Sequence, residues 1–367
     1  MEIPFISLRN QHETLRERLL EKMQKALDEN AFILGKEVEE FEEAYARFSG
    51  TKYCIGASNG TDALKICLRS LSIGPGHEVI IPANTFVATA VAVMEVGATV
   101  VLADPEPDTY NLSAKTILPR ITSKTKAIIP VHLYGNPCPM DEIMQLANEK
   151  SLHVIEDNAQ AQGASYKGQP TGSFGTINAT SFYPSKNLGA LGDAGAITTQ
   201  HEELYDEARL WRNLGTTAKY RHEIPGYNAR LDSLQAAFLS VKLPFLAQWN
   251  NERRRIAERY TRNLSNVSSL VLPTTHTMGE HVFHLFVIQT PERDKLQLAL
   301  AQQKIQTLIH YPVPIHLQLA FKSLGHTCGH FPVSEKLSNQ ILSLPLFIGI
   351  ADDEIDYVCE HIIQFHK

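Results

Sequence analysis

The chain has 367 residues, of which 43% are hydrophobic and 20% are charged, and its formal net charge is −6. This length predicts a large domain with a smaller one, and the composition excludes an intrinsically disordered chain. A moderately acidic protein of this kind is a poor general partner for nucleic acid or for an anionic membrane surface, so we expect neither.

The compartment is predicted from the first residues and the cysteines. The opening MEIPFISLRNQHE soon turns polar and lacks the apolar core of a secretory signal. The most apolar stretch, FVATAVAVMEVGATVVLAD, contains Glu95 and Gly97 and is typical of a buried helix and strand, not of a membrane span. The cysteines are five in number, an odd count, and are scattered along the chain, which favours reduced thiols: Cys54, Cys67, Cys138, Cys328 and Cys359. We expect a cytoplasmic protein with no membrane partner.

The start of the chain predicts two amphipathic helices, over residues 11–29 and 36–48. A strand over 54–58 then runs directly into a helix at SNGTDAL, so free backbone N–H groups and the positive end of the helix dipole point outward at Gly60 and Thr61. This geometry binds phosphate, although an ordinary capped helix start has the same pattern.

Apolar strands alternate with helix-length segments from residue 77 to residue 157. The strands are HEVIIP, ATVVLAD, KAIIPVH and LHVIED, and the helices are expected over 84–95, 113–120 and 140–150. This alternation predicts the α/β class, with a mostly parallel sheet covered on both faces. Ligands of such sheets bind at the carboxyl ends of the strands, where the loops hold Phe86, Asp157 and Gln160. His132, also at a strand end, is either part of a site wall or a satisfied core histidine.

Lys186 lies in a polar interval between two apolar runs, 179–183 and 194–199, that both read as buried strands. A lysine is almost never buried without a partner, and a desolvated amine becomes a nucleophile toward carbonyl groups, as Schiff-base chemistry requires. The alternative is a surface lysine beside a glycine-rich hairpin.

The rest of the chain predicts a helix over 201–213, a basic loop, and a long helical segment over 231–264 that Pro244 kinks. We place the domain boundary there, with a large cofactor-binding domain over 1–245 and a small α+β domain over 246–367. In the small domain we expect strands over 283–289 and 306–310 and helices over 293–303, 333–341 and 352–365.

A pyridoxal 5'-phosphate (PLP) site needs a carbonyl-reactive lysine, a phosphate-binding helix start, here called the phosphate cup, and a carboxylate at a strand end. Lys186 would carry the cofactor, Gly60 and Thr61 would bind its phosphate, and Asp157 would keep the pyridine nitrogen protonated. Phe86 is a candidate for stacking on the ring, although a core aromatic would also explain it.

SNGTDAL, PANTFVATA, EDNAQAQGASYKG, SFYPSKNLGALGDAGA and GYNARLDSLQAA resemble the DegT/StrS family of nucleotide-sugar aminotransferases, in order and over nearly the whole chain. The resemblance implies a fold type I PLP-dependent transferase. Lys186 then resembles the Schiff-base lysine, Asp157 the pyridinium partner and Gln160 the residue that bonds the ring hydroxyl. The remaining implied cofactor contacts are Gly60, Thr61, Ser181 and, from the neighbouring subunit of a homodimer with shared active sites, Asn228.

The block Tyr-Asn-Ala-Arg-Leu, preceded by Lys-Tyr-Arg-His, resembles the branch that acts on dTDP-linked 3-keto-6-deoxyhexoses. It implies transfer of an amino group from L-glutamate to C-3, giving a 3-amino-3,6-dideoxyhexose for a surface glycan or an antibiotic. A 4-keto-sugar aminotransferase and a regulatory protein with a PLP fold are the alternatives. Candidate substrate contacts are Tyr183, Lys219, Tyr220, Arg221, His222, His310 and Tyr311.

Two further patterns bear on the substrate. An amino-acid enzyme usually holds its substrate carboxylate with an arginine, and the chain has no arginine after Arg293, so the donor's carboxylate is left to Arg212 or Arg230. HTCGH, residues 326–330, has fewer ligands than a zinc site needs, so we expect no metal there and either a surface loop or a lid on the substrate side.

Overall fold

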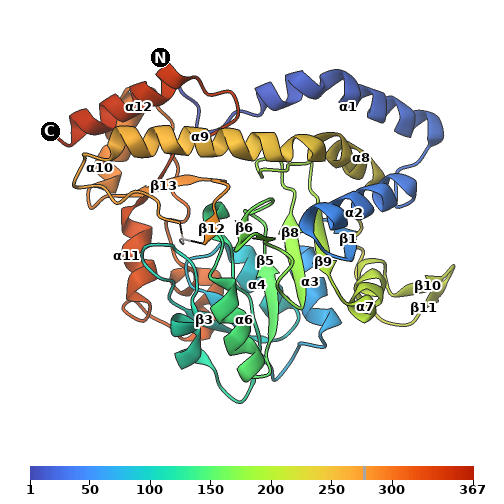
Figure 1. Cartoon of the computed structure of the whole chain (residues 1–367). Helices are drawn as coiled ribbons and strands as arrows, with labels where there is room; N and C mark the ends of the chain where they lie inside the picture. Colours follow the sequence, from blue (N-terminus) through green and yellow to red (C-terminus); the bar gives the residue numbers. More distant parts are fainter. Residues whose placement is uncertain (276–277) are drawn as a thin grey trace.

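The computed structural model describes residues 1–275 and 278–367 (Figure 1). Its centre is a seven-stranded sheet with the order β1-β9-β8-β5-β4-β2-β3. In that order the strands are Tyr53–Ala57, Gly195–Thr199, Ile177–Ser181, His153–Asp157, Thr125–Ile128, Glu78–Pro82 and Thr99–Ala103. Only β9 is antiparallel to its neighbours, β1 and β8, and the other pairs are parallel. The predicted mostly parallel α/β sheet is confirmed.

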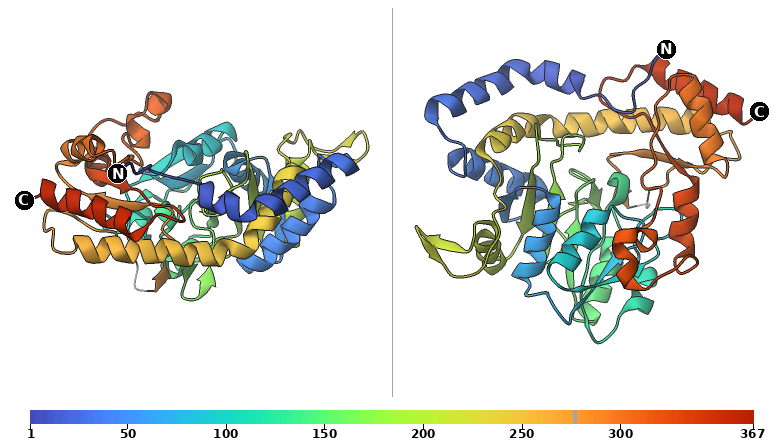
Figure 2. Two further views of the ribbon diagram at one scale, coloured as in Figure 1. Left: turned by 90° about the horizontal axis from the view of Figure 1, so that it is seen from above. Right: turned by 180° about the vertical axis from the view of Figure 1, so that it is seen from behind.

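Helices cover this sheet on both faces, as the apolar strand sequences require (Figure 2). The strands are buried almost throughout, and their side chains pack against helices from the intervening segments. None of the described helices is both long and apolar enough to cross a bilayer. The helices of this part are α1 Arg9–Glu29, α2 Lys36–Ser49, α3 Gly60–Ser70, α4 Val87–Glu95, α5 Ala114–Ile117, α6 Met140–Glu149, α7 Glu202–Arg212 and α8 Ser233–Lys242.

The C-terminal part forms a second core beside the sheet. Its elements are α9 Leu246–Leu264, β13 Phe286–Gln289, α10 Arg293–Gln302, α11 Pro332–Gln340, β14 Ile341–Leu344 and α12 Asp352–Phe365. Ile3 from the other end of the chain is fully buried in this core, where its backbone pairs with Ile305. The division at residue 246 stays a prediction.

Three sequence predictions differ from the structure. The expected strand over 306–310 is wrong, because there only an isolated bridge joins Leu308 to Ser343; the strand that pairs with β13 is β14. The predicted basic loop contains a hairpin of β10 Thr216–Ala218 and β11 Arg221–His222. Pro244 does more than kink the long helix, since a 3-10 turn over Leu243–Phe245 separates α8 from α9. The small β6 Ser165–Tyr166, β7 Gln169–Pro170 and β12 Gly279–Glu280 form a separate sheet.

His132 is a satisfied core histidine, which decides between the two predicted alternatives. The backbone N–H of Cys138 donates to His132 Nδ1 at 3.0 Å, so Nε2 carries the proton and donates to Glu156 Oε2 at 2.8 Å. The Glu156 carboxylate also accepts from the backbone N–H groups of Gly172, Phe174 and Gly175. Both side chains are fully buried.

We predict that Glu156→Ala destabilises the protein strongly, because it leaves His132 and three backbone donors without an acceptor. The loss should be about 3–5 kcal/mol, the usual result of breaking a buried pair. Denaturant unfolding monitored by circular dichroism measures it. Glu13→Ala, which removes an exposed pair with Arg9, is the control and should leave the midpoint nearly unchanged. Equal effects of the two substitutions would contradict the prediction.

Candidate active site

The carboxyl ends of six strands share one edge of the sheet, because β1 and β8 run in the same direction as β5, β4, β2 and β3. The loops after these strands therefore meet there. Gly60 follows β1, Phe86 follows β2, Asp157 ends β5 and Ser181 ends β8. Predicted cofactor residues that are far apart in the sequence are thus brought to one edge.

The start of α3 forms a narrow cup against β8 and β9. Asn59 caps the helix by accepting from the Asp62 N–H at 2.8 Å, which leaves the N–H groups of Gly60 and Thr61 without an intrahelical acceptor. A Cβ at Gly60 would lie 2.7 Å from Ser181 Cβ, so only glycine fits this approach. The cup combines free N–H groups, a helix dipole and the Ser181 hydroxyl, which is the donor set that phosphate prefers.

Lys186 lies on the turn between β8 and β9, as predicted. Its backbone N–H donates to Tyr183 O at 2.8 Å, and Ala190 N–H donates to Phe182 O at 2.8 Å, which closes the turn. The Lys186 amine forms no hydrogen bond or ion pair with the residues that the structure describes. Burial lowers the pKa of this amine to about 8, and the nearby Asp157 charge only partly opposes that effect. At pH 7 about a tenth of the amine is therefore neutral and nucleophilic, far more than for a lysine with the ordinary pKa.

Asp157 is a buried carboxylate held in one orientation. Its Oδ2 accepts from Thr89 Oγ1 at 3.0 Å, and its Oδ1 accepts from the Ala159 N–H at 3.2 Å. Burial raises the pKa of Asp157, while the two hydrogen bonds and the charge of Lys186 act in the opposite direction. A neighbouring cation stabilises a buried carboxylate of this kind.

Aromatic side chains from the two parts of the chain enclose this space. The Tyr311 ring lies 5.3 Å from the ring of Phe86, and its hydroxyl accepts from Gln160 Nε2 at 3.2 Å. Gln160 Oε1 in turn accepts from the Tyr134 N–H at 2.6 Å. Burial and the Lys186 charge lower the pKa of His310, the neighbour of Tyr311, to about 4, so His310 is neutral.

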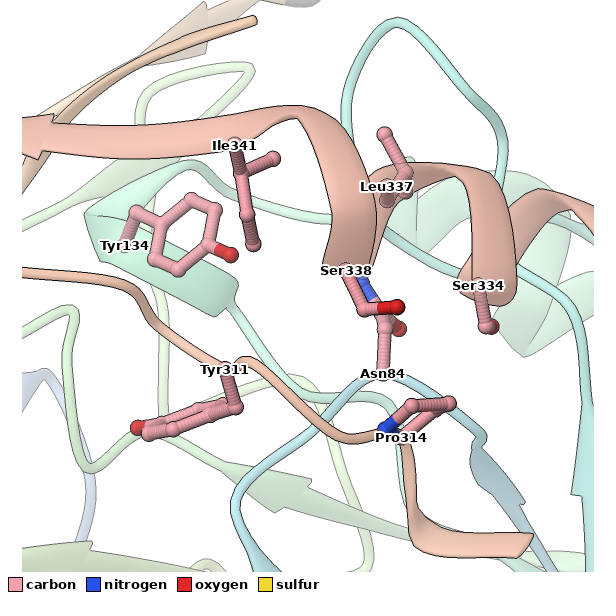
Figure 3. A pocket seen from close by; sticks show the side chains of 8 residues that line it. All are labelled: Asn84, Tyr134, Tyr311, Pro314, Ser334, Leu337, Ser338 and Ile341. Atoms are coloured by element: carbon pink, nitrogen blue, oxygen red, sulfur yellow. The ribbon is translucent and has the colours of Figure 1, made fainter. Parts of the chain in front are cut away.

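Behind Tyr311, a small cavity lies between the sheet loops and α11 (Figure 3). Its volume of about 10 Å³ accommodates roughly one water molecule. Asn84 Oδ1 is buried there without a hydrogen-bond partner among the described residues, whereas its Nδ2 donates to Tyr110 O at 3.0 Å. Tyr134, Tyr311 and Ser338 also line it.

The remaining predicted substrate and partner contacts are exposed on the surface of the chain. Tyr183 is exposed on the lysine turn. Lys219, Tyr220, Arg221 and His222 lie on the β10-β11 hairpin, which projects from the body beyond α7 (Figure 1). Asn228 is exposed beside the end of β1, where the Ser58 N–H donates to Ala229 O at 3.0 Å.

Of the two arginines considered for the donor's carboxylate, Arg212 makes structural contacts inside the protein. It is buried, bonds Glu42 through Nη1 and donates to Gly56 O at 3.1 Å. Arg230 is partly accessible and donates only to Asn213 Oδ1, at 3.3 Å. In the 326–330 loop, Cys328 Sγ and the Gly329 N–H donate to Glu335, and among the described residues no group of His, Cys, Asp and Glu side chains could hold a metal ion.

Several supporting residues could not be found from the sequence. Thr89, which holds Asp157, lies in a helix of small residues without any distinguishing pattern. Asn187 forms hydrogen bonds with both Asn250 and His284 behind the lysine turn, although the three residues come from distant segments. Asn187 adjoins Lys186, but an asparagine in a polar turn has many ordinary explanations.

The arrangement fits PLP. The glycine-lined cup matches its phosphate, the unpartnered amine matches its aldehyde, and the buried Asp157 carboxylate would pair with a protonated ring nitrogen. Gly60, Thr61 and Ser181 would hold the phosphate, Asp157 the ring nitrogen, and Phe86 would contact the ring.

Comparison with known proteins finds a matching family model, described as the DegT/DnrJ/EryC1/StrS aminotransferase family, over residues 13–363. A dTDP-3-amino-3,6-dideoxy-alpha-D-galactopyranose transaminase of Aneurinibacillus thermoaerophilus is 44% identical, over 99% of both chains. A UDP-N-acetyl-3-dehydro-alpha-D-glucosamine 3-aminotransferase of Acidithiobacillus ferrooxidans is 45% identical over 96% of this chain and 95% of its own. A pleiotropic regulatory protein of Geobacillus stearothermophilus is 43% identical over 100% and 99%.

Solved structures agree with these relatives. DesV of S. venezuelae, crystallised with a ketimine intermediate, superposes with a TM-score of 0.98 at 39% identity, covering 100% of this chain and 99% of its own. NtdA of Bacillus subtilis, with bound cofactor PMP, gives a TM-score of 0.93 at 33% identity, covering 100% of this chain and 85% of its own.

We predict that borohydride reduction of the PLP-loaded protein, followed by peptide mapping, places a pyridoxyl group on Lys186. In the protein without cofactor, acylation of the same amine should rise with pH around a midpoint of about 8, because burial disfavours its charged form. Lys36, an exposed lysine, is the internal control for the acylating reagent. A pyridoxyl group found only on another lysine would disprove the assignment.

Proposed function

The chain belongs to the DegT/DnrJ/EryC1/StrS aminotransferase family, and we propose that it transfers an amino group from L-glutamate to C-3 of a dTDP-linked 3-keto-6-deoxyhexose. The protein is a PLP-dependent sugar aminotransferase with the fold of that family. The observation that carries the proposal is the unpartnered Lys186 amine, which shares one sheet edge with Asp157 and the Gly60 cup.

A sugar ketone suits the site better than a second amino acid does. Arg212 is engaged with Glu42, and no arginine follows Arg293, so cationic partners for a substrate carboxylate are scarce. The names of the dTDP and UDP relatives differ in the nucleotide but share the 3-position of the sugar, which supports amination at C-3. The dTDP preference rests on the resemblance of the Tyr-Asn-Ala-Arg-Leu block.

The cofactor, when bound, would supply an electron sink for the carbanion that forms on the substrate and a carrier for the amino group. The chain supplies the acid-base chemistry: the neutral Lys186 amine accepts the proton from the donor's α-carbon, and the same amine later returns a proton to C-3 of the sugar. Asp157, fixed by Thr89, keeps the ring nitrogen protonated. Tyr311 lies against Phe86 and is hydrogen-bonded to Gln160.

We propose a homodimer whose two sites are shared. The basic residues Lys219 and Arg221 lie on a hairpin that extends away from the body of their own chain, and Asn228 at its base is exposed (Figure 1). In a dimer these groups would meet the sugar diphosphate and the cofactor phosphate of the partner. Exposed apolar side chains are consistent with such an interface: Leu20, Met23, Leu27, Phe32 and Ile33.

A regulatory role is the second candidate, because one relative of 43% identity is named a regulatory protein. A regulator would need a cofactor site but no sugar turnover, so the assay below distinguishes the two. The cytoplasm is the proposed compartment, and a surface glycan or an antibiotic sugar is the proposed destination of the product.

We predict that the purified enzyme aminates a dTDP-3-keto-6-deoxyhexose at C-3 when L-glutamate is present. The matched dTDP-4-keto sugar serves as the comparison, and NMR of the product locates the new amine. Amination at C-4 alone would overturn the C-3 assignment and leave the aminotransferase assignment intact.

We predict that mixing Asn228→Ala protein with Lys186→Ala protein restores activity. Each homodimer alone lacks one required group in every site, whereas a mixed dimer has one site with both groups intact. Roughly a quarter of the wild-type activity is expected if subunits exchange at random and each site works independently. Subunit exchange is checked by native mass spectrometry, and its presence without recovered activity would contradict site sharing.

A further inference from the structure

The turn that carries Lys186 is held from behind by the amide of Asn187, which is fully buried. Asn187 Nδ2 donates to Asn250 Oδ1 at 2.9 Å and to Val282 O at 3.0 Å. Its Oδ1 lies 3.2 Å from His284 Nδ1. Both amide hydrogens and the amide oxygen are therefore used, and they bind the lysine turn to two segments of the C-terminal part.

The same bonds lead back to the strand from which the turn starts. Asn250 Nδ2 donates to Gln162 O at 2.9 Å, and Gln162 Nε2 donates to Ser181 O at 2.6 Å. Ser181 is the last residue of β8. The network thus joins Ser181, at the end of β8, to Asn187 within the turn.

His284 is held in one tautomer by this network. Because Asn187 donates with its nitrogen, its oxygen must accept, and the proton of the neutral imidazole lies on His284 Nδ1. Burial and the charges of Lys186 and Arg253 keep the pKa of His284 well below its usual range. Arg253, one helical turn after Asn250 on α9, donates to the carbonyl groups of Phe283 and His284 at 3.2 and 3.3 Å.

We propose that Asn187 is the positioning residue of Lys186, and that Asn250 and His284 act through it. An amine on a turn can point into the site or toward water, and the hydrogen bonds of the adjacent residue fix the direction of the turn. Without them the Lys186 amine could turn toward solvent and lose the burial that lowers its pKa and the orientation that aims it at the reacting carbon. The proposal rests on the proposed catalytic role of Lys186.

The test compares Asn187→Ala, Asn250→Ala and the double variant. Asn111→Ala is the matched control, because Asn111 is equally buried and donates to Asn136 O at 2.8 Å while accepting from the Leu133 N–H at 3.1 Å. The pH midpoint of Lys186 acylation is measured by mass spectrometry in the protein without cofactor, and kcat and KM are measured in the loaded enzyme. His284→Gln, which retains a donor, is compared with His284→Leu.

Each single variant should raise the acylation midpoint by roughly one pH unit. It should lower kcat by about 10²-fold, as expected for a displacement of about 1 Å, with a smaller change in KM. The effect of the double variant should be smaller than the sum of the two single effects, because both substitutions remove the shared Asn187–Asn250 bond. His284→Gln should lie closer to the wild type than His284→Leu does.

The proposal is overturned if the variants lose stability as Asn111→Ala does but keep the wild-type midpoint and a kcat within about twofold of it. If Asn187→Ala does not fold, Asn250→Ala decides, because it removes the Asn187–Asn250 bond from the side of α9. A wild-type protein whose Lys186 carries no pyridoxyl group after reduction would instead contradict the proposed function.

Discussion

An amine that lies inside the protein without a hydrogen-bond partner is the constraint on which the rest of this site depends. Burial disfavours the charged form of any lysine, and it lowers the pKa of two lysines among the described residues. The pKa of both Lys186 and Lys242 is lowered to about 8. Lys242 donates to Gly189 O at 2.7 Å and contacts His12 Nε2 at 3.1 Å, so its amine is engaged in the fold. Lys186 has no such partner among the described residues, and its amine is the one left for chemistry.

The sheet determines what this amine can react with. Since six strands end at one edge, residues from separate loops converge there without long-range pairing of their own. The cup at Gly60, the Asp157 carboxylate and the lysine turn then bring anion-binding, cation-stabilising and nucleophilic groups together, which is the set that PLP requires. The C-terminal part adds Tyr311 on the open side and, through Asn250 and His284, hydrogen bonds behind the turn. Both parts of the chain are therefore needed for one site.

Local patterns predicted much of this architecture, and distant contacts account for what they missed. The alternation of apolar strands and helices was sufficient for the central sheet, and the bounds of the last helix, Asp352–Phe365, agree with the predicted 352–365. The strand expected over 306–310 is absent because this segment pairs with β14 only at Leu308, in an isolated bridge to Ser343. Lys186, Asp157 and Gly60 could be proposed because each follows a recognisable strand. Thr89, Asn187 and His284 could not, because their roles depend on partners far away in the sequence.

The most direct test traces the amino nitrogen of the donor with an isotope label. The purified, PLP-loaded protein is incubated with L-[¹⁵N]glutamate and, in separate reactions, with dTDP- and UDP-linked 3-keto and 4-keto sugars and with simple 2-oxo acids, and the products are analysed by mass spectrometry. The account predicts that ¹⁵N enters a nucleotide sugar in the wild type and not in Lys186→Ala. Label found only in amino acids formed from the 2-oxo acids, or in no product of a folded and loaded protein, would contradict it.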